Sequence, residues 1–169
     1  ARMGARSAMV GRVGGDIFGP QLLDGLAAAG VDISGIGVNS DESSGIAVIG
    51  VDETAQNCIT QILGANTTCG PDQAAAVKLG LPGAAVLLLQ LEVSIELSLE
   101  VAREARAQGV SVMLDPGPVR PVPAELLSLC DVITPNETEA QALVDFPVNG
   151  PESAAKAAEV LLEMGVGTA

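Results

Sequence analysis

An uninterrupted apolar run over residues 84–90, Ala-Ala-Val-Leu-Leu-Leu-Gln, restricts the possible folds more than any other stretch of this sequence. A strand that is apolar at consecutive positions, and not only at alternate ones, suits a parallel sheet that is covered on both faces. Helical and strand-like segments alternate around it: a helix over 71–79, a helix over 94–108, a strand over 110–114, a helix over 124–129, a strand over 132–134, and helices over 136–144 and 151–164. This alternation predicts an α/β fold with a doubly wound, mainly parallel sheet.

The N-terminal part of the chain begins with the same alternation and then departs from it. Residues 7–14 predict a buried strand, Asp16 is placed to cap the helix that follows, and Gly30 ends that helix. Residues 44–63 then predict two strands joined by a polar turn over 52–57, with no helix between them. Such a pair indicates either a small antiparallel subdomain added to the main sheet or a hairpin at the edge of that sheet.

Composition excludes several classes of function. The net charge of −13, from 21 acidic and 8 basic residues, repels phosphate backbones and anionic lipid heads, so we expect no nucleic-acid or membrane partner. No histidine is present, which excludes histidine-based acid–base catalysis. The three cysteines, Cys58, Cys69 and Cys130, show no Cys-x-x-Cys spacing and argue against a disulfide framework or a zinc site. We expect them to be small buried side chains in a reducing compartment, and therefore a cytoplasmic protein.

The most informative local motif is Asp-Val-Ile-Thr-Pro-Asn-Glu-Thr-Glu-Ala over residues 131–140. A short apolar run stops at Pro135, and Asn136 and Glu139 have the spacing of a capping box at the start of a helix. The same two residues follow the end of a predicted parallel strand, where ligands bind in open α/β folds. The spacing favours a helix cap, and a ligand-binding role stays open beside it.

Five motifs in order give the chain a family resemblance. They are Gly-Arg-Val-Gly-Gly-Asp-Ile-Phe-Gly at 11–19, Gly-Ala-Asn at 64–66, Leu-Gln-Leu-Glu at 89–92, Leu-Asp-Pro-Gly-Pro at 114–118 and Thr-Pro-Asn-Glu-Thr-Glu-Ala at 134–140. Together they resemble the phosphofructokinase-B-type (PfkB) family of carbohydrate kinases, and within it the ribokinase branch. The resemblance implies a ribokinase-like α/β fold with a small β-sheet lid.

The resemblance also implies roles for individual residues. Glu92 resembles a glutamate that hydrogen-bonds a sugar hydroxyl. Without the resemblance, the sequence is equally consistent with a solvated residue before a helix. Asn136 resembles an asparagine that contacts ATP, and Glu139 a glutamate that influences Mg²⁺ and phosphate binding. The implied reaction transfers a phosphoryl group from MgATP to the 5-hydroxyl of D-ribose, with K⁺ as an activator.

The predicted hairpin over 44–63 resembles the family's lid, which closes over the sugar and forms a homodimer contact. Two segments depart from the family pattern. Asp-Pro-Gly-Pro at 115–118 stands where Asn-Pro-Ala-Pro is usual, so we assign no role to Asp115, and Asp-Phe-Pro-Val at 145–148 replaces a Leu-Thr-Gly turn.

The ends of the sequence suggest a partial domain. Only five residues follow the helix predicted over 151–164, where a further strand is expected. By resemblance, a sugar-binding Gly-Gly-Lys-Gly segment is expected before Ala1, and a Gly-Ala-Gly-Asp motif with the catalytic base after Ala169. We therefore expect residues 1–169 to form a partial ribokinase-like domain with no catalytic residue of its own and no turnover alone. Alternatives are a kinase for another sugar or a nucleoside, and a non-catalytic binding or dimerisation module.

Overall fold

The structure is a computed structural model that describes residues 1–55 and 57–169. Gln56, which belongs to the turn predicted over 52–57, lies outside the described residues. The chain divides into two compact units, Ala1–Ala76 and Val77–Ala169. No helix among the described residues is long and apolar enough to cross a membrane.

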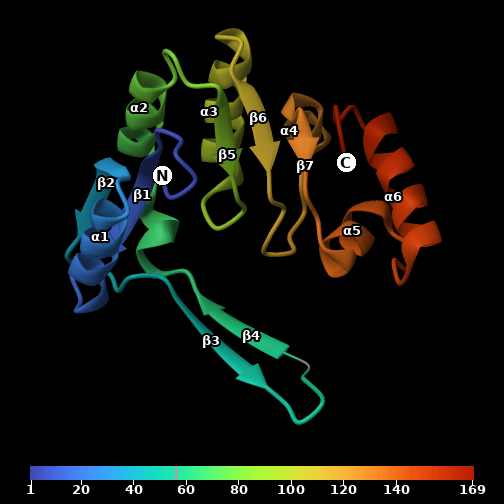
Figure 1. Ribbon diagram of the computed structural model, residues 1–169, viewed down its shortest axis with the longest axis horizontal. Helices are drawn as coiled ribbons and strands as arrows, with labels where there is room; N and C mark the ends of the chain where they lie inside the picture. Colours follow the sequence, from blue (N-terminus) through green and yellow to red (C-terminus); the bar gives the residue numbers. More distant parts are fainter. Residues whose placement is uncertain (56) are drawn as a thin grey trace. The chain divides into compact units, whose positions relative to one another are not determined.

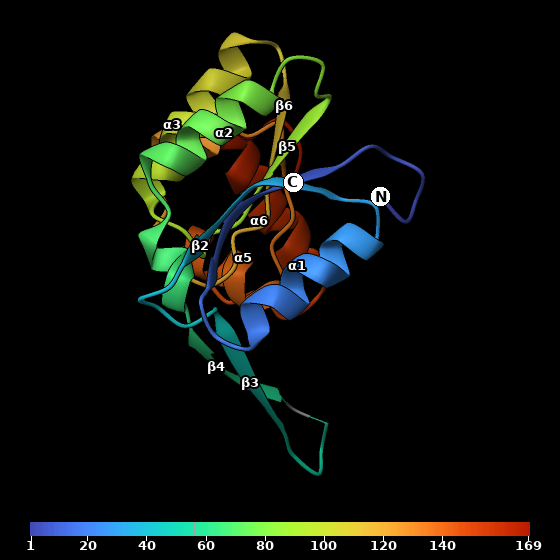
Figure 2. The same cartoon turned by 90° about the vertical axis from the view of Figure 1, so that its left-hand side faces the viewer.

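The first unit is built on two parallel strands, β1 (Ala8–Gly14) and β2 (Asp32–Asn39), joined by helix α1 (Phe18–Ala28). Helix α1 packs against both strands (Figure 2). The predicted cap is confirmed, because Asp16 Oδ1 accepts hydrogen bonds from the backbone N–H groups of Phe18 at 3.1 Å and Gly19 at 3.0 Å. Gly30, just beyond the helix, has a φ of +79°, a conformation that favours glycine.

A two-stranded antiparallel hairpin follows, formed by β3 (Ile46–Val51) and β4 (Asn57–Ile62). The short 3₁₀ helix η1 (Gly64–Thr68) and helix α2 (Pro71–Gly80) come next, with Pro71 at the first helical position as predicted.

The large apolar side chains of the hairpin are exposed on both of its faces; they are Val48, Ile49, Val51, Ile59 and Ile62. The prediction that all three cysteines are buried is therefore wrong for Cys58, since residues 58–62 of β4 are exposed, whereas Cys69 and Cys130 are buried.

The second unit contains three parallel strands in the order β5 (Val86–Leu89), β6 (Ser111–Leu114) and β7 (Val132–Ile133) (Figure 1). Its helices are α3 (Ile95–Ala107), α4 (Ala124–Leu129), α5 (Glu137–Val144) and α6 (Pro151–Glu163). The predicted alternation of strands and helices is confirmed in this unit, with element boundaries shifted by at most about two residues.

The core of the second unit lies on one face of this sheet. Val112, Leu114 and Ile133 are almost completely buried there with side chains from the helices, including Leu126 and Leu161. On the other face, Val86 is 49% and Leu88 is 70% exposed, so β5 is open to solvent there, whereas Met113 and Val132 are partly buried. The expectation that the 84–90 strand is covered on both faces is thus wrong for this chain.

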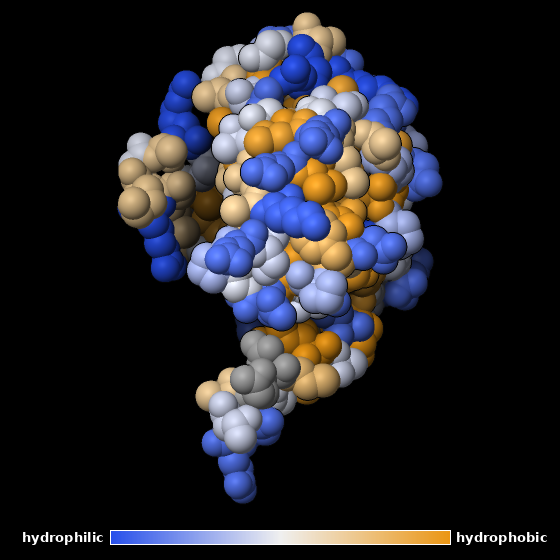
Figure 3. Space-filling view, turned by 90° about the vertical axis from the view of Figure 1, so that its right-hand side faces the viewer, coloured by the Kyte–Doolittle hydropathy of each residue, from blue (hydrophilic) through white to orange (hydrophobic). Residues whose placement is uncertain are grey.

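Hydrophobic surface is also visible between hydrophilic side chains in the space-filling view (Figure 3).

Beyond α6, the C-terminal residues lie beside β7, where a further strand was expected. Gly167 N–H donates to Cys130 O at 3.1 Å, and Ile133 N–H donates to Thr168 O at 3.0 Å.

Candidate functional site

The loops after β5, β6 and β7 leave the same edge of the parallel sheet (Figure 1). All three predicted site residues lie at this edge, since Glu92 follows β5, and Asn136 and Glu139 follow β7. Carboxyl ends of parallel strands are where open α/β folds bind ligands, because the loops there converge while the strands hold them rigidly. The second unit therefore brings the predicted residues to one edge.

Asn136 and Glu139 form the predicted capping box at the start of α5. Glu139 N–H donates to Asn136 Oδ1 at 2.9 Å, and Asn136 N–H donates to Glu139 Oε2 at 2.9 Å. Each side chain thus uses one polar atom for the cap. The second atom, Asn136 Nδ2 or Glu139 Oε1, makes no hydrogen bond within the part of the chain that the structure describes. The cap and a ligand-binding role are therefore compatible in both residues.

Gly117, in the loop after β6, adjoins the unused oxygen of Glu139. A Cβ placed on Gly117 would lie 2.9 Å from Glu139 Oε1 and 3.6 Å from Asp115 Oδ1. The missing side chain leaves room for both carboxylates beside the same backbone segment. Sequence reasoning assigned no role to Asp115, although its position immediately after a parallel strand was an available signal.

Glu92 is connected to the same place through its neighbour in the chain. Leu91, which is fully buried, donates its N–H to Gly117 O at 2.9 Å. Glu92 itself is half-buried and belongs to the loop between β5 and α3. The carbonyl of Gly117 thus contacts the loop that carries Glu92, and the Cα of Gly117 lies next to the carboxylate of Glu139.

The comparisons with known proteins agree with this architecture. The model of the pfkB family carbohydrate kinases matches residues 1–169. The chain belongs to this family. Ribokinase of Haemophilus influenzae is 36% identical over 171 residues, covering 99% of this chain and 55% of that protein. Deoxyribokinase of Salmonella typhi is 29% identical over 167 residues, covering 98% of this chain and 55% of that protein.

Among solved structures, that of Arabidopsis thaliana ribokinase complexed with ribose and ATP matches with a TM-score of 0.81 and 31% identity. The match covers 95% of this chain and 53% of that one. The predicted ribokinase-like α/β fold is confirmed. The pfkB family chain described here spans about half the length of the curated relatives it matches.

The residues at the sheet edge suit Mg²⁺ carried by a nucleotide. Carboxylate oxygens are the hard ligands that Mg²⁺ prefers, and in phosphate-transfer sites one or two carboxylates complete a shell supplied mainly by phosphates and water. Asp115 and Glu139 offer two such groups beside Gly117. Two carboxylates match the number that such a shared coordination shell takes from the protein.

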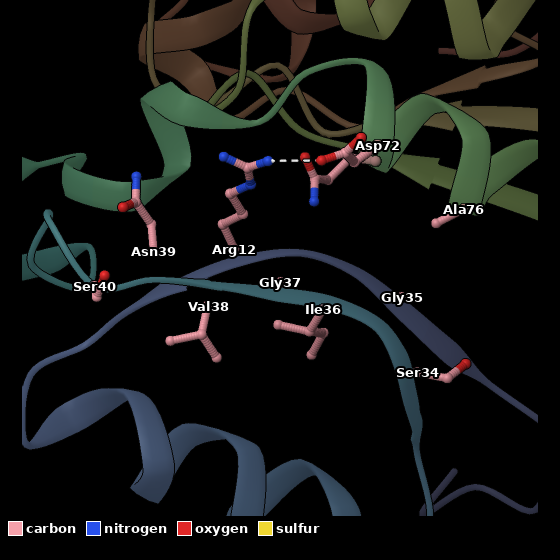
Figure 4. A pocket seen from close by; sticks show the side chains of 11 residues that line it. Arg12, Ser34, Gly35, Ile36, Gly37, Val38, Asn39, Ser40, Asp72 and Ala76 are labelled. Carbon is pink, nitrogen blue, oxygen red and sulfur yellow. Dashed lines mark hydrogen bonds and ion pairs between the residues drawn. The ribbon is translucent and has the colours of Figure 1, made fainter.

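A second feature lies in the first unit and contains none of the predicted site residues. A recess of about 440 Å³ is lined by β2 and the start of α2 (Figure 4). Arg12 lies in it and forms an ion pair with Asp72 at 3.3 Å and a hydrogen bond with Thr68 Oγ1 at 3.4 Å. Asp72 is 84% exposed, so this pair contributes little to stability. Among the described residues, Arg12 therefore has partners from both η1 and α2.

Proposed function

We propose that this chain supplies the sugar-facing and nucleotide-facing edge of an ATP-dependent kinase that phosphorylates the 5-hydroxyl of D-ribose. The observation that carries the proposal is the meeting of three loops at Gly117 in a chain that matches the carbohydrate kinase family along its whole length. Residues from these loops have the chemistry that a sugar, a nucleotide and Mg²⁺ require.

Each residue has a proposed role that suits the chemistry of its side chain. The carboxylate of Glu92 accepts hydrogen bonds from sugar hydroxyl groups, which are donors that a carboxylate suits. Asn136 keeps its Nδ2 group for the nucleotide, and Glu139 keeps Oε1 for the water shell of Mg²⁺. When bound, Mg²⁺ neutralises charge on the phosphates during transfer. K⁺ is proposed as the activator that the family resemblance implies.

D-ribose is the proposed sugar because the ribokinase relative is 36% identical and the deoxyribokinase relative 29%. Deoxyribose is the second candidate, because the deoxyribokinase relative is also similar but at the lower identity. Because these sugars differ by one hydroxyl group, a site that hydrogen-bonds this group should reject the sugar that lacks it. Titration of the chain with ribose and 2-deoxyribose under identical conditions distinguishes the two.

The β3–β4 hairpin is proposed as the lid and the homodimer contact. Its exposed apolar side chains, which include Ile49 and Ile59 directly opposite each other, suit a surface that a sugar site or a second copy covers. A closed lid excludes water that would otherwise compete with the sugar hydroxyl for the phosphoryl group.

Cap-preserving variants test the assignment of the site. Glutamine also fits the third position of a capping box, so Glu139→Gln should keep α5 stable and weaken MgATP binding at least about tenfold. Glu92→Gln should weaken ribose binding by a similar factor and leave MgATP binding unchanged. Glu137→Gln, exposed in the same helix start, is the matched control. Calorimetric titrations in which both site variants bind both ligands like the wild type contradict the proposal.

Turnover by the 169 residues alone is not expected, because none of them matches the aspartate that serves as base in the family. Purified chain supplied with ribose, MgATP and K⁺ should release ADP at the background rate. Sustained ADP release that copurifies with the chain and is lost in Glu92→Gln would refute this part of the proposal.

A further inference from the structure

Arg120 lies in the segment after β6 but contacts the loop after β5. Its Nη1 group donates to Leu91 O at 3.1 Å and to Val93 O at 3.0 Å. These two carbonyls flank Glu92 in the chain. One guanidinium nitrogen therefore holds the peptide group before Glu92 and the peptide group after Val93.

The segment from Leu91 to Val93 is fixed from several directions. Leu91 N–H donates to Gly117 O, and Ser94 Oγ accepts from Leu97 N–H at 3.2 Å, which caps α3 directly after the loop. The two hydrogen bonds from Arg120 hold the carbonyls of Leu91 and Val93, which lie between the Leu91 N–H and the Ser94 side chain. Hydrogen bonds from a charged donor are stronger than neutral ones, and both of these are partly buried. A connection between a strand and a helix is otherwise among the more mobile parts of a domain.

We propose that Arg120 is a positioning residue that holds the backbone around Glu92, so that the Glu92 carboxylate is presented at the sheet edge in one conformation. The assignment of Glu92 to the sugar rests on the proposed function, whereas the restraint of its backbone does not. A side chain that must accept hydrogen bonds from a ligand binds more tightly when its own conformations are already restricted.

The test compares Arg120→Met with Arg103→Met in the full 169-residue chain. Both substitutions remove a guanidinium group and keep a long apolar stem. Arg103 pairs with Glu125 on the surface at 2.7 Å and is 55% exposed, and it therefore controls for the loss of charge. Amide hydrogen exchange at Leu91 and the backbone order of Glu92, both measured by NMR, report the restraint directly.

Arg120→Met should increase the exchange rate of the Leu91 amide at least about tenfold and increase the motion of Glu92, while amides in α6 keep their protection. Arg120→Lys, which keeps donors on a differently shaped group, should give a smaller change. Unchanged exchange at Leu91 overturns the proposal. An equal rise in exchange throughout the second unit overturns it as well, because that result indicates general destabilisation.

Ribose titrations separate this proposal from the proposed function. If both hold, Arg120→Met weakens ribose binding, and the double variant with Glu92→Gln binds no more weakly than Glu92→Gln alone, because both changes remove the same interaction. If Arg120→Met frees the loop and Glu92→Gln leaves ribose binding unchanged, the sugar-binding role of Glu92 fails and the positioning role stands. If Glu92→Gln abolishes ribose binding and Arg120→Met changes neither binding nor exchange, the positioning role fails alone.

Discussion

Ser44 Oγ donates a 2.7 Å hydrogen bond to Asp16 Oδ1, which joins the segment entering the β3–β4 hairpin to the turn that starts α1. Ser44 N–H donates to Asp16 Oδ2 at 2.8 Å, and Gly14 N–H donates to Ser44 Oγ at 3.0 Å. Ser44 is fully buried although its neighbours in the chain are exposed. This small polar cluster fixes the base of the hairpin, while the apolar side chains further along it, including Val48, Ile49 and Ile59, are exposed to solvent.

Replacing Ser44 by alanine should destabilise the first unit by about 1–3 kcal/mol, because the buried Gly14 N–H loses its acceptor. Ser43→Ala is the control, since Ser43 is exposed and its backbone carbonyl, which accepts from Ala65 N–H at 2.8 Å, is kept by the substitution. Chemical denaturation of both variants measures the difference. Equal unfolding free energies for the two variants would show that the hydroxyl of Ser44 has no structural role.

Two glycines of α1 should respond in opposite ways to alanine. A Cβ on Gly19 would lie 2.2 Å from Gly14 O, whereas a Cβ on Gly25 meets nothing within 4 Å. Gly25→Ala should stabilise the chain by about 0.5–1 kcal/mol, because alanine favours helices over glycine. Gly19→Ala should destabilise it by more than about 2 kcal/mol, because backbone must move. Thermal melts of both variants check the signs, and a Gly19→Ala protein as stable as the wild type contradicts the close approach.

Stability should decrease in acid. The hydrogen bond from the Ser44 side chain is the main factor that lowers the pKa of Asp16 below its usual value of 3.8. The backbone N–H of Val112 does the same for the pKa of Asp131, assisted by Arg106. A lowered pKa in the folded state means that the unfolded state takes up protons first as the pH falls. The contribution of these two carboxylates to the free energy of unfolding is therefore present above about pH 4. It is lost as the pH falls through their pKa values in the folded state.

Urea midpoints measured at pH 7, 5 and 3 test this expectation. The midpoint should stay nearly constant between pH 7 and 5 and fall between pH 5 and 3. Asp131→Asn should be less stable than the wild type at pH 7 and should lose less stability on acidification. A wild-type midpoint that is the same at pH 3 as at pH 7 would be inconsistent with both carboxylates being stabilised in the folded state.

The chain should self-associate through the hairpin. Ile49 and Ile59 face each other across β3 and β4 and are 59% and 51% exposed. Replacing both with threonine keeps strand propensity and removes apolar surface, so it should shift the sedimentation profile toward monomer. Leu79→Thr is the control, because Leu79 is 84% exposed and lies outside the hairpin. Equal effects of the two substitutions would indicate non-specific association.

Local features of the site were predictable from the sequence. The capping box of Asn136 and Glu139 follows from spacing, because its hydrogen bonds join residues three positions apart. The cap formed by Asp16 and the helix start at Pro71 follow for the same reason. The exposure of Cys58 and of Leu88 was not predictable in this way, since it depends on which surfaces other parts of the chain cover.

The sequence by itself determined the α/β alternation, the hairpin and the family, because these depend on patterns and motifs within short segments. Only the tertiary structure decided that Glu139 uses Oε2 for its cap and directs Oε1 toward Gly117, and that Arg120 holds the carbonyls around Glu92. The reason is that these contacts join loops from different strands. Such loops meet only after a parallel sheet has aligned the strand ends, and no local pattern in the sequence specifies which of their atoms then touch.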